Sequence, residues 1–145
     1  MIMIREAKEQ DLQDILTLYN QPDMDGDCLE PEQARQIFYK MKTYPDYRVY
    51  VAQIDENIVG TFTLAILDNM VHRGSNTGII ESVAVYADHQ GQGIGKAMMK
   101  HAMDLCREKK CYKVSLSSGM KRTKAHHFYE KLGFKKHGYS FFAEI

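Results

Sequence analysis

The sequence has no excess of charge of either sign: 19 Lys and Arg residues balance 19 Asp and Glu residues, so the formal net charge at pH 7 is zero. A protein that binds nucleic acid or an anionic membrane through its overall charge needs a basic surplus. The balance therefore argues against both kinds of partner. A local basic patch that binds a smaller anion is still compatible with it.

Cysteines and long apolar runs are also scarce. The three cysteines, Cys28, Cys106 and Cys111, are odd in number and lack the spacing of zinc ligands, so we expect reduced thiols and no metal site. No apolar run approaches the about 18 residues that indicate a membrane-spanning helix. The first residues run into charged sequence without the pattern of a signal peptide. Together these absences predict a cytoplasmic protein.

What is present is an ordinary globular composition. Of the 145 residues, 44% are hydrophobic and 26% are charged, and no repeat, low-complexity tract or linker interrupts the chain. We therefore expect one domain over residues 1–145. Apolar spacing predicts a helix that begins at Pro31 and others over residues 8–20, 93–109 and 124–132, with Asp11 as a candidate cap. Strand-like runs cover residues 2–5, 48–54, 58–67, 79–86 and 112–117, and period-two alternation returns at 139–145.

The order of these segments predicts an α+β fold. The two runs at 48–54 and 58–67 are joined by a short turn, which indicates a hairpin. The helix at 93–109 joins the strands at 79–86 and 112–117 as one parallel βαβ crossover. The expected architecture is a mixed central sheet with antiparallel N-terminal strands, one parallel crossover and about four helices.

The segment Gln90-Gly91-Gln92-Gly93-Ile94-Gly95-Lys96 connects the strand at 79–86 to the following helix. The first N–H groups of a helix have no partner within it, and the helix dipole adds partial positive charge there. Glycines let a bulky anion approach this backbone, so the turn is suited to hold a pyrophosphate. Lys96 and the side-chain amide of Gln90 can add donors.

The spacing of the glycines excludes two common nucleotide motifs. A dinucleotide fingerprint would need glycine at position 96 or a small residue at position 98, where Lys96 and Met98 stand. A P-loop would need glycine at Gln90 and Ser or Thr at Ala97. What the turn does match is Gln-x-x-Gly-x-Gly, the pyrophosphate motif of the GNAT superfamily of acyl-CoA-dependent N-acyltransferases.

The resemblance to GNAT proteins covers nearly the whole chain and has a second anchor. The segment 80–85, Ile-Glu-Ser-Val-Ala-Val, leads into the glycine turn, and Ala-His-His-Phe-Tyr-Glu-Lys-Leu-Gly-Phe at 125–134 is similar to the tail motif of the family. The resemblance implies a GNAT-type fold with acetyl-CoA as cosubstrate, no metal, and the pantetheine arm paired along the strand edge. The implied cofactor-binding residues are Val83, Ala84, Val85, Gln90, Gly91, Gln92, Gly93, Ile94, Gly95, Lys96, Ser117 and Tyr129.

Two side chains are candidates for catalysis. An alkyl ammonium of pKa about 10.4 must lose its proton before it attacks, which costs about 4.6 kcal/mol at pH 7. Glu81, among apolar strand neighbours that would raise its pKa, is the candidate base, directly or through a water; the alternative is a glutamate that pairs with a basic neighbour. The resemblance makes Tyr129 the acid that protonates the leaving thiolate; the alternative is a core tyrosine. Arg122 stands where many members have asparagine, and Ser117 or Ser118 is expected to replace that contact.

The expected function is an N-acetyltransferase that moves acetyl from acetyl-CoA to a primary amine by direct attack in a ternary complex. A small-molecule amine is favoured, because the chain also resembles aminoalkylphosphonate and aminosugar-phosphate acetyltransferases around Lys121 and Cys111. A protein lysine or N-terminus is the alternative acceptor, and a non-catalytic acyl-CoA-binding module is the alternative class. The resemblance also allows a homodimer.

Overall fold

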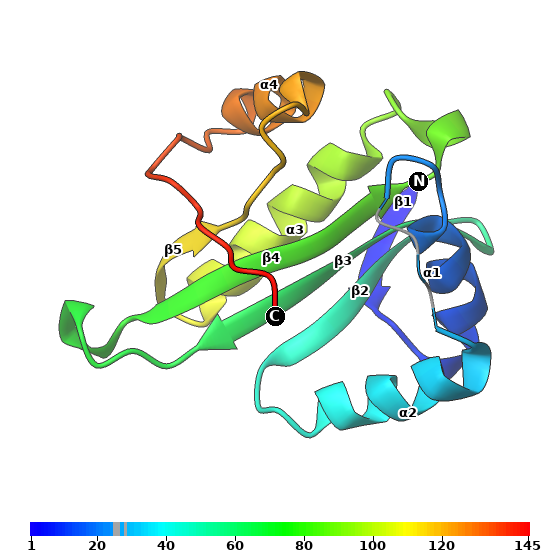
Figure 1. Cartoon of the computed structure of the whole chain (residues 1–145), viewed down its shortest axis with the longest axis horizontal. Coiled ribbons are helices and arrows are strands. Elements are labelled where there is room, and N and C mark those ends of the chain that lie inside the picture. The colour runs from blue at the N-terminus through cyan, green and yellow to red at the C-terminus, as the bar shows by residue number, and fades with distance from the viewer. Residues whose placement is uncertain (25–26, 28) are drawn as a thin grey trace. The chain divides into compact units, whose positions relative to one another are not determined.

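The computed structural model describes residues 1–24, 27 and 29–145. Five strands of the described residues form one sheet in the order β1 (Ile2–Glu6), β2 (Tyr47–Ile54), β3 (Asn57–Leu67), β4 (Asn76–Val85) and β5 (Cys111–Ser115), as Figure 1 shows. The first four strands pair antiparallel, and β4 pairs with β5 in parallel. The predicted mixed α+β sheet with one parallel crossover is confirmed.

The chain forms two compact units, residues 1–115 and residues 116–145. The first unit holds the sheet with α1 (Leu12–Tyr19), α2 (Pro31–Lys42) and α3 (Ile94–Glu108), and the second holds α4 (Thr123–Lys131). Short 3-10 turns cover Glu9–Asp11, His72–Gly74 and Ala87–His89. The expectation that residues 1–145 are a single domain stays a prediction.

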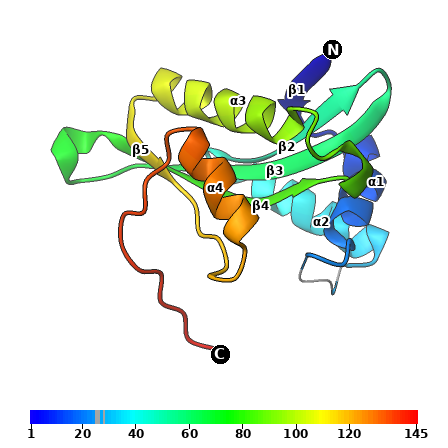
Figure 2. The same cartoon turned by 90° about the horizontal axis from the view of Figure 1, so that it is seen from above.

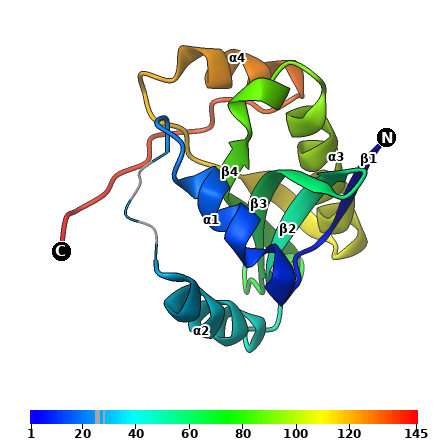
Figure 3. The ribbon, with the colours of Figure 1, turned by 90° about the vertical axis from the view of Figure 1, so that its right-hand side faces the viewer.

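Helices cover both faces of the sheet in the first unit, with α1 and α2 on one face and α3 on the other (Figures 2 and 3). Successive side chains of a strand point to opposite faces, so each strand contributes to both layers. On the α3 face the layers approach closely at Gly60, where an added Cβ would lie 3.0 Å from the Sδ atom of Met98. The core on the α1 and α2 face consists of Ala7, Ile15, Leu18, Phe38, Val49, Val51, Ile58 and Ala84.

Two helix signals from the sequence act as expected. Pro31 occupies the first turn of α2, where its missing N–H costs no helical hydrogen bond. Gly133 follows α4 with φ of 96° and donates its N–H to the carbonyl of Glu130, which ends the helix. None of the described helices is long and apolar enough to cross a membrane.

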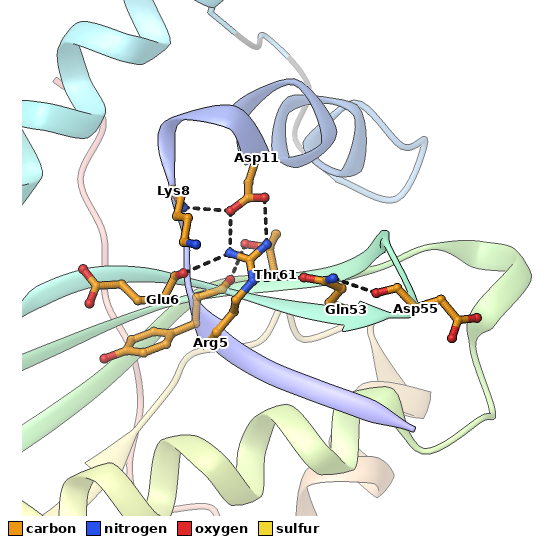
Figure 4. A network of polar contacts seen from close by, with 8 residues as sticks. Arg5, Glu6, Lys8, Asp11, Gln53, Asp55 and Thr61 are labelled. Atoms are coloured by element: carbon orange, nitrogen blue, oxygen red, sulfur yellow. Dashed lines mark hydrogen bonds and ion pairs between the residues drawn. The ribbon is translucent and has the colours of Figure 1, made fainter.

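Two expectations about local structure were wrong: the side-chain cap at Asp11 and the strand suggested by the alternating tail. The helix predicted over residues 8–20 is a 3-10 turn followed by α1, and the Asp11 carboxylate forms no cap on α1 because it binds Arg5 and the Lys8 N–H instead (Figure 4). The alternating tail at 139–145 forms no strand, and Tyr139, Phe141 and Ile145 are exposed. Alternating apolar and polar residues form a half-buried strand only where a neighbouring strand can pair with them.

Cys28, for which we expected a reduced thiol, lies outside the described residues.

Candidate active site

The strand β4 contains an irregularity at its centre. Thr63 on β3 faces Glu81, whereas Thr61 faces Ala84, so three steps on β4 oppose two on β3. The extra residue forms a β-bulge, and Ser82 there adopts φ of 53°, a conformation that side chains other than glycine rarely take. The bulge re-aims the β4 backbone between Glu81 and the glycine turn.

After Ile79, the side of β4 away from β3 has a free edge. The parallel pairing of β4 with β5 runs only from Asn76 to Ile79, and no strand of the described residues pairs with that side of residues 80–85. An extended chain can add to such an edge through backbone hydrogen bonds. The Val85 carbonyl is already engaged, because it accepts hydrogen bonds from Gln21 Nε2 at 3.2 Å and Gln90 Nε2 at 3.5 Å.

The glycine turn leads into α3 without any side-chain cap. Gly91 and Gly93 have φ of 81° and 83°, and Gly93 is the N-cap residue of the 15-residue helix. The helical hydrogen bonds of α3 begin at Ala97, whose N–H donates to the Gly93 carbonyl at 3.0 Å. The three preceding amides have no helical partner, which is the usual anion-binding arrangement.

The space around this helix end is open. A Cβ added at Gly91 or at Gly93 would meet no atom within 4 Å, so there is open space beside the backbone of both glycines. Lys96 is exposed in the first turn of α3 and forms none of the ion pairs within the described residues. The residues present therefore fit a pyrophosphate of the kind that acetyl-CoA carries. Gln92 instead donates to the Asp88 carbonyl at 3.4 Å.

Glu81 is exposed, so the expectation that apolar strand neighbours enclose it was wrong. The apolar Ile80 beside it is buried because it points to the opposite face of the sheet, as alternation requires. Glu81 lies in one cross-strand row with Val49 and Thr63. Burial raises the pKa of the Tyr47 phenol, and the charge of Glu81 raises it further, which places Tyr47 within electrostatic reach of the candidate base.

A pocket of about 370 Å³ lies between α1, α2 and the sheet, next to this row. Sequence reasoning missed it, because it depends on the packing of two helices against particular strand positions. The polar groups in its wall are Asp27, Tyr47, Thr63 and Ser82. The apolar side chains in its wall are Leu12, Ile15, Leu16, Tyr19, Met24, Leu29, Ala34, Ile37, Phe38, Met41 and Val49.

The second unit contains the other half of the predicted site. The Tyr129 ring packs edge-on against Phe128 and Phe134, with centroids 5.1 and 5.6 Å away. Burial raises the pKa of the Tyr129 phenol, while the charge of Arg122 lowers it. Ser117 Oγ donates to Ser140 Oγ at 3.4 Å. Glu81 and the glycine turn lie in the first unit. That Tyr129 and Ser117 form one site with them stays a prediction.

The loop around His72 is removed from the row that contains Glu81. His72 stacks on Tyr112 at the start of β5, with ring centroids 3.9 Å apart, at the beginning of β4 rather than at its bulge. The described residues contain no group of three or more His, Cys, Asp or Glu side chains arranged to hold a metal ion.

The mixed sheet with its bulged fourth strand and its uncapped helix after a glycine turn is the arrangement expected of an acyltransferase fold. Residues 10–134 match the acetyltransferase (GNAT) family, and the chain belongs to that family. A glucosamine 6-phosphate N-acetyltransferase of Trypanosoma brucei brucei is 39% identical over 90 residues, which are 62% of this chain and 59% of that protein's own length. The match thus spans less than two thirds of that relative.

Two further proteins match more of the chain. An N-alpha-acetyltransferase 30 of Schizosaccharomyces pombe is 27% identical over 92% of this chain and 84% of its own length. The solved structure of a putative acetyltransferase from Agrobacterium tumefaciens superposes with a TM-score of 0.90 at 29% identity, covering 99% of each chain. The GNAT-type fold expected from the sequence is confirmed.

Proposed function

We propose that this protein transfers the acetyl group of acetyl-CoA to a primary amine by direct attack within a ternary complex. The observation that carries the proposal is the uncapped N-terminus of α3, which follows two left-handed glycines and lies next to the free edge of β4. These amides bind the pyrophosphate of the cosubstrate, and the β4 edge pairs with its extended arm. The relatives named as N-acetyltransferases support the same chemistry.

Two side chains move protons in this proposal. Glu81 is exposed on β4 at the bulge and accepts the proton of the incoming ammonium, directly or through one water. Tyr129 donates a proton to the departing thiolate. Its phenol remains protonated at neutral pH, because burial raises its pKa above the ordinary value near 10. Neither step needs a covalent acyl-enzyme.

The acceptor is a small-molecule amine, since the pocket beside Glu81 is bounded by two helices and has a volume of about 370 Å³. A protein N-terminus is the second candidate, favoured by the match to an N-alpha-acetyltransferase over 92% of the chain. A non-catalytic acyl-CoA-binding module is the third. It would need neither Glu81 nor Tyr129.

The test is thiol release measured with acetyl-CoA and a panel of amines, together with calorimetric binding of acetyl-CoA. Release that depends on both substrates and saturates with each supports the proposal. Tight binding without release from any amine or peptide would leave only the binding module. Lack of acetyl-CoA binding would refute the role assigned to the glycine turn.

A further inference from the structure

We infer that the amine acceptor carries an apolar body, aliphatic or aromatic, that enters the pocket between α1, α2 and the sheet, and that it carries no phosphate group. The inference rests on the proposed function and names the substrate class of the same site. It departs from the phosphorylated amino sugar that the name of the trypanosomal relative indicates for that protein.

The wall of the pocket is mostly apolar. Twelve of its 15 lining residues are apolar or aromatic, and none is Lys, Arg or His. Two of these apolar side chains, Leu29 and Ile37, remain 44% and 46% exposed. A bound apolar group would cover this surface and gain free energy in proportion to the area removed from water. A phosphate would lose its hydration there without gaining a cationic partner.

The charged groups that face the pocket are acidic. The lining residues include the carboxylate of Asp27 and no Lys, Arg or His. Glu81 adds a carboxylate on β4 whose charge reaches the Tyr47 phenol in the pocket wall. Such a field attracts an ammonium and repels a phosphate dianion before any contact forms.

Three of the four polar groups of the wall, Tyr47, Thr63 and Ser82, lie on strands, and the fourth, Asp27, lies between α1 and α2. Thr63 faces Glu81 across the β3 and β4 pairing, and Ser82 occupies the bulge next to it. The apolar side chains come chiefly from α1 and α2 on the other side. An amine with an apolar body fits this division, because its ammonium lies near Glu81 while its carbon skeleton extends toward the helices. Glu81 is then positioned to take up the proton.

The experiment is a series of straight-chain amines from methylamine to heptylamine, with phenethylamine and glucosamine 6-phosphate, at saturating acetyl-CoA. We expect kcat/KM to rise about fourfold per added methylene until the pocket is filled, which corresponds to the free energy of burying a methylene. A short peptide with an N-terminal leucine forms a separate arm, because it presents the same chemistry from a protein source. Calorimetric binding of hexylamine to the CoA complex provides a readout without turnover.

The matched variants lie on α2. Ile37→Ala should lower kcat/KM for hexylamine by about threefold to tenfold and leave methylamine within twofold, because it removes apolar surface from the wall. Gln36→Ala, next to it but exposed and absent from the wall, should change neither amine. Ile37 is nearly half exposed, so its truncation should leave the fold intact.

The two ideas fail in different ways. Efficient acetylation of glucosamine 6-phosphate with a flat or falling alkylamine series would overturn the inference and leave the proposed acetyltransferase standing. Absence of thiol release from every amine and peptide would overturn both. A rising series that Ile37→Ala flattens supports both, and a higher kcat/KM for the peptide than for free amines would assign the same pocket to a protein N-terminus.

Discussion

Arg5 on β1 holds Asp11 at the start of α1 through two parallel hydrogen bonds, Nη1 to Oδ2 at 2.7 Å and Nη2 to Oδ1 at 3.0 Å (Figure 4). The Lys8 N–H donates a third bond to Oδ2 at 2.7 Å. Asp11 is only 4% exposed, so these donors replace the water that its carboxylate has lost. The pair thereby fixes the beginning of the helix that forms one wall of the pocket.

Arg5→Ala should lower the free energy of unfolding by about 3 kcal/mol, because it leaves the buried Asp11 carboxylate without its charged partner. Urea unfolding followed by circular dichroism measures the change. Arg35→Ala is the control, since Arg35 and its partner Glu32 form an exposed ion pair on α2. Equal effects of the two substitutions would contradict the importance assigned to the Arg5–Asp11 pair.

Acid should destabilise the protein partly through Asp11. Burial by itself raises the pKa of this carboxyl, but the hydrogen bonds from Arg5 and from the Lys8 N–H together outweigh burial and lower it. A depressed folded pKa means that the unfolded chain takes up the proton first. This contribution is therefore complete above the unfolded pKa of about 3.9 and is lost as the pH falls through the lower folded value.

Unfolding free energies of the wild type and of Asp11→Asn between pH 7 and pH 2 test this linkage. The wild type should lose more stability than the variant below about pH 4, because the variant has no carboxyl at this position to protonate. Parallel pH profiles for the two proteins would show that Asp11 makes no such contribution.

Gly93→Ala should weaken acetyl-CoA binding by about tenfold, because the free turn then leaves the left-handed conformation (φ of 83°), which costs alanine about 1–2 kcal/mol, and binding has to restore it. Gly93→Asn should recover part of this loss, because asparagine tolerates that conformation better. No atom lies within 4 Å of the added Cβ, so steric overlap within the described chain does not contribute. Calorimetry with acetyl-CoA measures both variants, and an unchanged affinity in Gly93→Ala would refute the role of the turn.

Gly78→Ala should destabilise the first unit by about 1–3 kcal/mol, because the added Cβ would lie 2.5 Å from Cys106 Sγ between β4 and α3. Cys106→Ala removes that sulfur, so the double variant should be less destabilised than the sum of the two single ones. Thermal unfolding of all four proteins gives the comparison. Strict additivity would mean that the two positions do not compete for space.

Tyr129→Phe should lower kcat by about a hundredfold or more and leave the Kd of acetyl-CoA within twofold, because it removes a proton donor but retains the ring. Its matched control is Tyr139→Phe in the same unit, since Tyr139 is 90% exposed. If Tyr129→Phe changes only KM, Tyr129 has a structural role.

Glu81→Gln should lower kcat/KM for amines of high pKa.

The periodic segments could be read from the sequence because their signals are local. Apolar spacing located the four helices, strand-like runs located β1 to β5, and the alternating glycines between β4 and α3 predicted an open, uncapped helix end that the structure contains. These features depend on residues within a few positions of one another. The predicted role of Glu81 came from its place on the strand before the glycine turn, and that of Tyr129 came from the resemblance; both stay to be tested.

Three features could be seen only in the tertiary structure. They are the exposure of Glu81, the pocket, and the lack of a strand at residues 139–145. Whether Glu81 faces solvent or core depends on its pairing with Thr63 and on the bulge at Ser82, which decide the face on which each β4 side chain lies. The pocket arises where α1 and α2 pack over Thr63 and Ser82, which are distant in sequence from either helix. The glycine motif after β4 thus predicted the cosubstrate end locally, whereas the proposed acceptor end emerges only from long-range packing, because no short stretch of chain contains its wall.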